Sequence, residues 1–74
     1  MIDIKDTLVL SDNNEYVVVS KAVMDNVTYY YLVDINNITN FKFFYLDKDE
    51  LVEIEDKELI RKLIPLLTQN IKFN

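Results

Sequence analysis

The sequence contains no cysteine, histidine, glycine or tryptophan in its 74 residues. Without cysteine, the chain cannot form a disulfide, a thiolate nucleophile or a zinc ribbon. Without histidine, it lacks the side chain used most often as a general base and as a metal ligand. Catalysis would therefore depend on carboxylates, Lys, Tyr, Ser or Thr, and a carboxylate needs a sheltered pocket to raise its pKa. We expect a protein that is not an enzyme and that binds no cofactor and no metal.

The absence of glycine also excludes the phosphate-binding loops of nucleotide-dependent enzymes, whose backbone must approach the phosphate closely. Another residue type must then fill the turn positions with positive φ, and Asn and Asp adopt that conformation most readily after glycine. Clusters of Asn and Asp separate the apolar runs, at "SDNNE", "MDNV", "DINNITN" and "LDKDE". Each cluster is predicted to form a turn between two strands.

Positive charge is scarce as well, with 8 basic against 13 acidic residues and a net charge of −5. Direct binding to DNA or RNA normally needs a basic stripe, and an anionic membrane surface attracts a basic amphipathic face. The sequence has no apolar run long enough to span a membrane, and its first residues lack the basic and apolar regions of a signal peptide. We therefore expect a cytoplasmic protein that binds neither nucleic acid directly nor a membrane.

Half of the residues are hydrophobic and 12% are aromatic, which is enough for the core of a single small domain over residues 1–74. Between the turns the hydrophobicity alternates with a period of two, which is typical of half-buried strands. In the second run, Tyr16, Val18 and Ala22 are predicted to share one face. The predicted strands are residues 2–10, 15–24, 27–35, 41–46 and a short fifth segment, 51–54. None of the connections is long enough for a parallel crossover, so the strands form an antiparallel meander.

The period changes near the end of the sequence. Apolar residues there follow helical spacing: Leu59, Ile60, Leu63, Ile64 and Leu67. Asp56 can cap this helix, and Pro65 is expected to kink or end it near Ile64, with one further turn beyond. The predicted fold class is α+β, an antiparallel β-meander of four to five strands over about residues 2–54. One C-terminal helix, over about residues 56–69, packs on one face of the sheet.

Aromatic residues are concentrated in the third and fourth predicted strands, and together they form a candidate interaction surface: Tyr29, Tyr30, Tyr31, Phe41, Phe43, Phe44 and Tyr45. Aromatic sheets that stack nucleic-acid bases carry Lys and Arg around the rings, whereas this pair of strands offers Lys42 beside two acids. Cross-strand packing is therefore the favoured interpretation. Tyr29 and Tyr31 must point to the opposite side from Tyr30, so the run is not one surface patch.

Large apolar side chains occur on both faces of the predicted central strands, and one short helix cannot cover both. The surplus must be buried by a curled sheet or by a second subunit. We therefore expect a protein partner, which includes a second copy of this chain in a homodimer.

The segment "DKDELVEIEDKE" supplies a candidate acidic surface: Asp47, Asp49, Glu50, Glu53, Glu55 and Asp56. It holds only fragments of a calcium-binding loop, and a solvated edge strand followed by a helix cap accounts for the charges. In an alternative interpretation, the acids imitate a phosphate backbone and inhibit a nucleic-acid-binding protein. Such an inhibitor would suit a phage or mobile element.

The order "LVLSDNNEYVVV", "YYYLVD" and "LVEIEDKELI" resembles the small YrzB-like proteins of unknown function from low-GC Gram-positive bacteria. The resemblance covers residues 7–67 and rests on a strand ending in an acid, two aromatic strands and an acid pair before a final helix. It implies this fold and a cytosolic bacterial setting, and it carries no activity and no site residues. The expected function is that of a non-catalytic interaction module or accessory factor.

Overall fold

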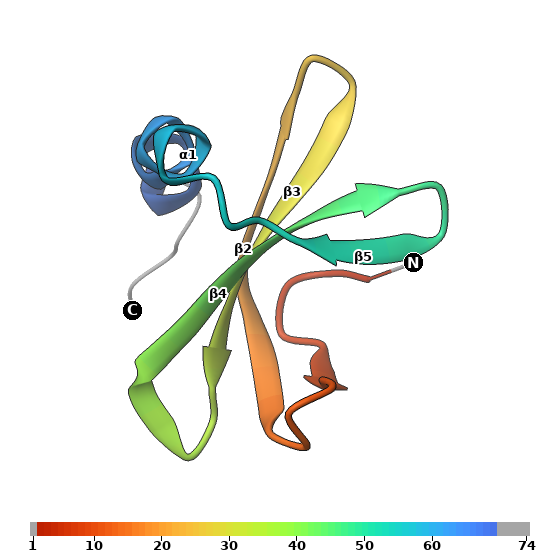
Figure 1. The fold of residues 1–74 in the computed structure, drawn as a ribbon, viewed down its shortest axis with the longest axis vertical. Helices are drawn as coiled ribbons and strands as arrows, with labels where there is room; N and C mark the ends of the chain where they lie inside the picture. The colour runs from red at the N-terminus through yellow and green to blue at the C-terminus, as the bar shows by residue number, and fades with distance from the viewer. Residues whose placement is uncertain (1, 70–74) are drawn as a thin grey trace.

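The computed structural model describes residues 2–69 of the chain. Over these residues, five strands are followed by one helix (Figure 1). Their bounds are β1 Thr7–Val9, β2 Glu15–Met24, β3 Val27–Asp34, β4 Asn37–Asp47, β5 Glu50–Glu53 and α1 Lys57–Gln69. Each strand pairs antiparallel with its neighbour in sequence, in the order β1-β2-β3-β4-β5. The predicted α+β fold with an antiparallel meander and a C-terminal helix is confirmed.

Asn and Asp replace glycine at several of the turns. Asp25 and Asn26 have φ of 53° and 66° and form the two-residue loop between β2 and β3. Asn13 adopts a similar conformation in the loop after β1, with φ of 65°. Lys5 and Lys48 also have positive φ, of 77° and 57°, although a lysine Cβ is disfavoured there. The sequence pattern predicts the turn around Lys48, but it does not indicate that either lysine adopts a positive φ.

The first strand is shorter than predicted because the chain turns before it. Asp6 N donates to Asp3 O at 3.1 Å, and Asp3 N donates to Asp6 Oδ2 at 2.8 Å. Lys5, with its positive φ, lies within this turn. The strand β1 therefore begins at Thr7, although Lys5 N still donates to Val18 O of β2 at 2.8 Å. Apolar residues on both sides of the turn pack inward.

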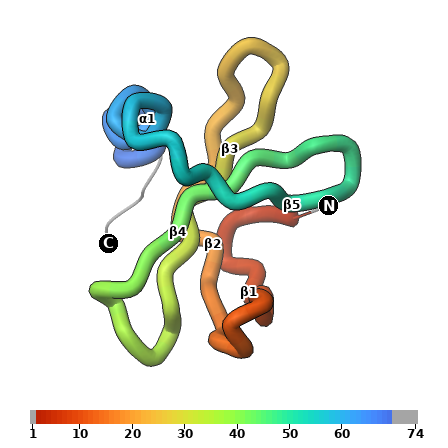
Figure 2. The backbone as a smooth tube through the Cα atoms, in the orientation of Figure 1, coloured from red at the N-terminus to blue at the C-terminus, as the bar shows by residue number. Residues whose placement is uncertain are grey.

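The sheet curls (Figure 2). A core of buried side chains lies against each of its faces. The helix core lies between α1 and the sheet and contains Ala22, Tyr29, Phe43, Ile54, Leu63 and Leu67. The second core contains Tyr16, Val18, Tyr30, Leu32 and Phe44, with Ile2, Leu8, Leu10, Leu46 and Leu51 packed against it. As predicted, Tyr29 and Tyr30 contribute to different cores. The curled sheet thus covers much of the apolar surface that the helix leaves bare.

A β-bulge in β2 transfers the even-numbered residues of this strand from one core to the other. Val18 pairs with Leu32 of β3. The next pair joins Ser20 to Tyr31, so Val19 has no counterpart on the partner strand. Inserting one residue in this way shifts the side-chain alternation relative to the neighbouring strand.

The bulge corrects the predicted faces of the second strand. Before it, Tyr16 and Val18 point into the second core, whereas Ala22 beyond it points into the helix core. The prediction that these three residues share one face is therefore wrong. Ser20, immediately after the bulge, is fully buried and donates from Oγ to the backbone oxygen of Leu67 in α1 at 2.6 Å.

The helix begins as predicted and runs past its proline. Asp56 caps it, because Glu58 N donates to Asp56 Oδ1 at 3.0 Å. The helix does not end at Ile64 but continues through Pro65 to Gln69. This last turn places Leu67, which is 1% exposed, in the helix core. The burial offsets the backbone hydrogen bond that proline cannot donate.

Candidate interaction surface

Three aromatic rings from two strands form a cluster on the helix side of the sheet. Tyr31 of β3 stacks on Phe43 of β4, with ring centroids 5.1 Å apart and an interplanar angle of 21°. Phe41 meets Tyr31 and Phe43 edge-on, at centroid distances of 5.8 Å and 5.9 Å. The arrangement follows from register, because Tyr31 is directly opposite Phe43 in the ladder and Phe41 lies two residues away on the same face. We call these three residues the aromatic cluster.

The helix turns this cluster into a pocket. Ile64, Leu67 and Thr68 of α1 line the other side of a largely apolar cavity of about 220 Å³, here called the aromatic pocket. At its rim, Phe41 is 51% exposed and Ile64 is 44% exposed. An apolar cavity of about 150 Å³ can hold benzene. The aromatic pocket is therefore large enough for one apolar side chain.

The seven aromatic residues of the predicted interaction surface differ in burial. The buried ones are Tyr29, Tyr30, Phe43 and Phe44. Tyr31 and Tyr45 are half-buried, and Phe41 is exposed over half of its surface. Of the seven, the aromatic pocket brings together Tyr31, Phe41 and Phe43. Tyr30 and Phe44 lie in the second core, on the other face of the sheet.

The sequence does not predict that α1 forms one side of the aromatic pocket. Ile64 belongs to the predicted apolar positions of α1, but its spacing gives no reason to leave it partly open to solvent. Its exposure depends on where α1 crosses the sheet, which helical spacing does not specify. Thr68 lines the same cavity, and nothing in the sequence pattern indicates that it does.

The predicted acidic surface follows the β4–β5 hairpin and the connection to α1. All six of its residues are exposed: Asp47, Asp49, Glu50, Glu53, Glu55 and Asp56. Two of them have structural roles, because Lys42 Nζ lies 3.5 Å from Glu53 Oε2 and Asp56 caps α1. In the described part of the chain, no group of three or more His, Cys, Asp or Glu side chains is placed to hold a metal ion.

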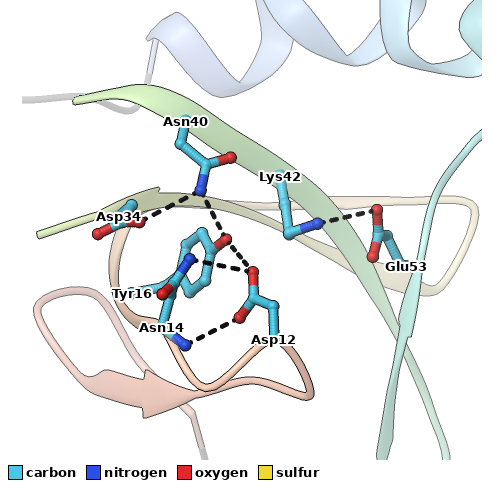
Figure 3. Close-up of polar contacts among 7 residues, drawn as sticks. All are labelled: Asp12, Asn14, Tyr16, Asp34, Asn40, Lys42 and Glu53. Carbon is cyan, nitrogen blue, oxygen red and sulfur yellow. Dashed lines mark hydrogen bonds and ion pairs between the residues drawn. The ribbon is translucent and has the colours of Figure 1, made fainter. Parts of the chain in front are cut away.

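A polar network ties the loop after β1 to β4 (Figure 3). The hydroxyl of Tyr16 donates to Asp12 Oδ2 at 2.7 Å, and Asn40 Nδ2 donates both to that hydroxyl at 2.9 Å and to Asp34 Oδ2 at 3.2 Å. The hydrogen bond from Tyr16 holds the pKa of Asp12 below its usual value, with help from the backbone N–H of Asn14. The same bond, together with burial, raises the pKa of Tyr16. Asp12 therefore acts here as an ionised structural acceptor.

A second cavity, of about 390 Å³, opens beside this network and includes two carboxylates in its lining, Asp12 and Glu53. Two acids in one pocket are the minimum for carboxylate-only catalysis, and one of them must have a raised pKa to act as an acid near neutral pH. Here the pKa of Asp12 is lowered, and Glu53 pairs with Lys42. The arrangement supplies hydrogen bonds and an ion pair that stabilise the structure.

Comparisons of this chain with family models, curated proteins and solved structures found no match. The resemblance to YrzB-like proteins therefore stays a prediction. Across residues 2–69, no helix is long and apolar enough to cross a membrane.

Proposed function

We propose that this protein is a small non-catalytic interaction module of the bacterial cytoplasm, and that it binds a protein partner through the aromatic pocket. The observation that supports this function is the pocket itself. It combines a 220 Å³ apolar cavity with rim residues Phe41 and Ile64, which are about half exposed. Protein interfaces commonly derive most of their binding energy from one apolar or aromatic anchor buried in such a cavity.

The position of these exposed side chains supports the proposal more than their number. Isolated exposed apolar residues are ordinary on protein surfaces and need no function. Phe41 and Ile64, in contrast, come from different elements and border the same cavity. The partner supplies an aromatic or branched apolar side chain to the pocket. A second copy of this chain, as in a homodimer, is one such partner.

Affinity capture from cells of the source organism, with paired variants, tests this function. Phe41→Asp places a charge at the rim of the pocket. Val9→Asp is the matched control, because Val9 is 70% exposed and borders the other cavity, of about 390 Å³, and not the aromatic pocket. A pocket-bound partner is lost with Phe41→Asp, retained with Val9→Asp and still captured at high salt. Light scattering on the same variants detects self-association and shows whether Phe41→Asp abolishes it.

The alternative function, an acidic inhibitor that imitates nucleic acid, gives the opposite pattern in the same experiment. Its partner is retained by Phe41→Asp, dissociates steeply with salt and is lost when Asp49 is changed to Lys in the exposed β4–β5 hairpin. That result would refute the pocket as the binding site. Two carboxylates of the acidic surface, Glu53 and Asp56, already have structural roles as the ion-pair partner of Lys42 and as the helix cap. This favours the aromatic pocket over the acidic surface as the binding site.

A further inference from the structure

The helix that borders the aromatic pocket is basic, although the chain as a whole is acidic. α1 carries three basic residues, Lys57, Arg61 and Lys62, and one acidic residue, Glu58, in a chain with a net charge of −5. The β4–β5 hairpin, which holds part of the acidic surface, projects away from α1 (Figure 1). Positive charge is therefore concentrated on the same element that forms one wall of the pocket.

Two of these cations continue the row of α1 residues that lines the pocket. Ile64 and Thr68 border the cavity and are one helical turn apart. Arg61 precedes Ile64 by three residues and Lys57 precedes Arg61 by four, so both lie on the same side of the helix. Along the helix axis, Arg61 is about 4.5 Å and Lys57 about 10 Å from Ile64. Helical spacing places Lys62 on the opposite side.

Arg61 is the cation best placed to contact a partner in the pocket. Its Nη1 lies 3.7 Å from Glu58 Oε1, and the two side chains are 74% and 81% exposed. Such an exposed pair contributes little to stability, so the guanidinium can exchange Glu58 for an incoming carboxylate at small cost. A guanidinium also binds a carboxylate through two parallel hydrogen bonds. Lys57, in contrast, directly follows two acids, Glu55 and Asp56.

We propose that the partner of the aromatic pocket is an acidic segment of another protein, with one aromatic or branched apolar side chain in the pocket and a carboxylate beside it on Arg61. This partner chemistry rests on the proposed function, because it specifies what binds in the same pocket. The six residues that line the cavity are uncharged, so the apolar anchor supplies most of the affinity. The carboxylate fixes the orientation of the segment, and Arg61 repels basic segments.

The acidic segment of this chain itself matches that description less well. Residues 47–56 hold the acidic surface, and no large apolar side chain is exposed among them. A second copy of the chain would therefore bring its carboxylates to α1 without an anchor for the pocket. This favours another protein as the source of the segment.

Selection from a random peptide library displayed on phage tests the proposal, with the full chain immobilised as bait. Enriched peptides should combine one aromatic or large aliphatic residue with Asp or Glu close to it in sequence. Arg61→Glu should remove the preference for acids. Lys62→Glu is the matched control, because it makes the same charge change on the opposite side of the helix. Phe41→Asp should remove the enrichment, with circular dichroism showing that each variant is folded.

Fluorescence anisotropy on one enriched peptide measures the size of the effect. Exposed ion pairs are weak, so Arg61→Gln should weaken binding by about 1.5- to 5-fold. The same peptide with its acids changed to amides should bind the unsubstituted chain and Arg61→Gln equally. Glu58→Gln removes the carboxylate that competes for Arg61, so it should tighten binding of the acidic peptide.

Failure of this proposal and failure of the proposed function give different results. Apolar anchors enriched without acids, or a preference for acids that survives Arg61→Glu, would overturn the acidic partner and leave the pocket as the binding site. Enrichment that Phe41→Asp leaves unchanged, or no enrichment, would overturn both. Light scattering that shows self-association abolished by Arg61→Glu would identify the segment as part of a second copy and refute another protein as its source.

Discussion

Replacing Ser20 by alanine tests the connection between the bulge of β2 and the end of α1. Ser20 Oγ is fully buried and donates to Leu67 O at 2.6 Å across 47 residues of sequence. Leu67 lies in the last turn of the helix, where carbonyl oxygens lack partners within the helix. Ser20→Ala therefore removes the side-chain donor from a buried acceptor.

The expected loss of stability is large for so small a change. Leaving a buried hydrogen-bonding group unsatisfied costs about 1–3 kcal/mol. A domain of this size has a total unfolding free energy of roughly 4–11 kcal/mol. Each kcal/mol shifts the melting temperature of a domain of 60–100 residues by about 4–8 °C. We therefore expect Ser20→Ala to lower the melting temperature by at least about 4 °C.

Thr68→Ala is the matched control, because Thr68 Oγ1 also donates to a carbonyl of α1, that of Pro65 at 3.2 Å, but at an exposed position. Water replaces the lost donor there, so the cost should stay within about 0.5 kcal/mol. Urea unfolding followed by far-ultraviolet circular dichroism measures both variants. Equal losses for the two, or a loss below about 0.5 kcal/mol for Ser20→Ala, would show that the buried bond does not hold the helix to the sheet.

Two further predictions concern a turn and the response to acid. Lys48 has φ of 57°, so Lys48→Gly should raise the unfolding free energy by up to about 1 kcal/mol, whereas Lys48→Ala should bring no gain in a thermal melt. Asp12 has a lowered pKa in the folded protein because Tyr16 donates to it, so its contribution to stability is present above the unfolded-state pKa and is lost as pH falls through the folded-state value. Asp12→Asn and Tyr16→Phe should both flatten the decline of the unfolding free energy below about pH 4, measured by urea titration at several pH values. A decline as steep as that of the wild type would contradict this role for the pair.

The parts of the fold that could be predicted have local causes. Asp25 and Asn26 form a tight turn because their side chains tolerate positive φ, and Asp56 caps the helix because it directly precedes the helical spacing. The alternation of Tyr29, Tyr30 and Tyr31 between faces follows from strand geometry alone.

The parts that could not be predicted depend on contacts between distant segments. The bulge at Val19 leaves no trace in the pattern, because the even-numbered residues of β2 stay buried on both sides of it while they face different cores. Lys5 and Lys48 adopt positive φ without the residue type that normally indicates it. In the candidate site, aromatic clustering indicated Tyr31 and Phe41, but the cavity exists because α1 places Ile64 beside them.

The sharing of β2 and β3 between two cores has a consequence for how the molecule opens. Adjacent residues Tyr29 and Tyr30 fill opposite cores, so separating either core disturbs the strand that supports the other. The two cores should therefore behave as one foldon, and the amide protons of β2 and β3 should exchange with solvent through global unfolding. Local openings are left to β1 at the sheet edge and to the first turn of α1. Both walls of the aromatic pocket belong to the foldon, because Leu67 of α1 is buried in the helix core and accepts the hydrogen bond from Ser20 of β2.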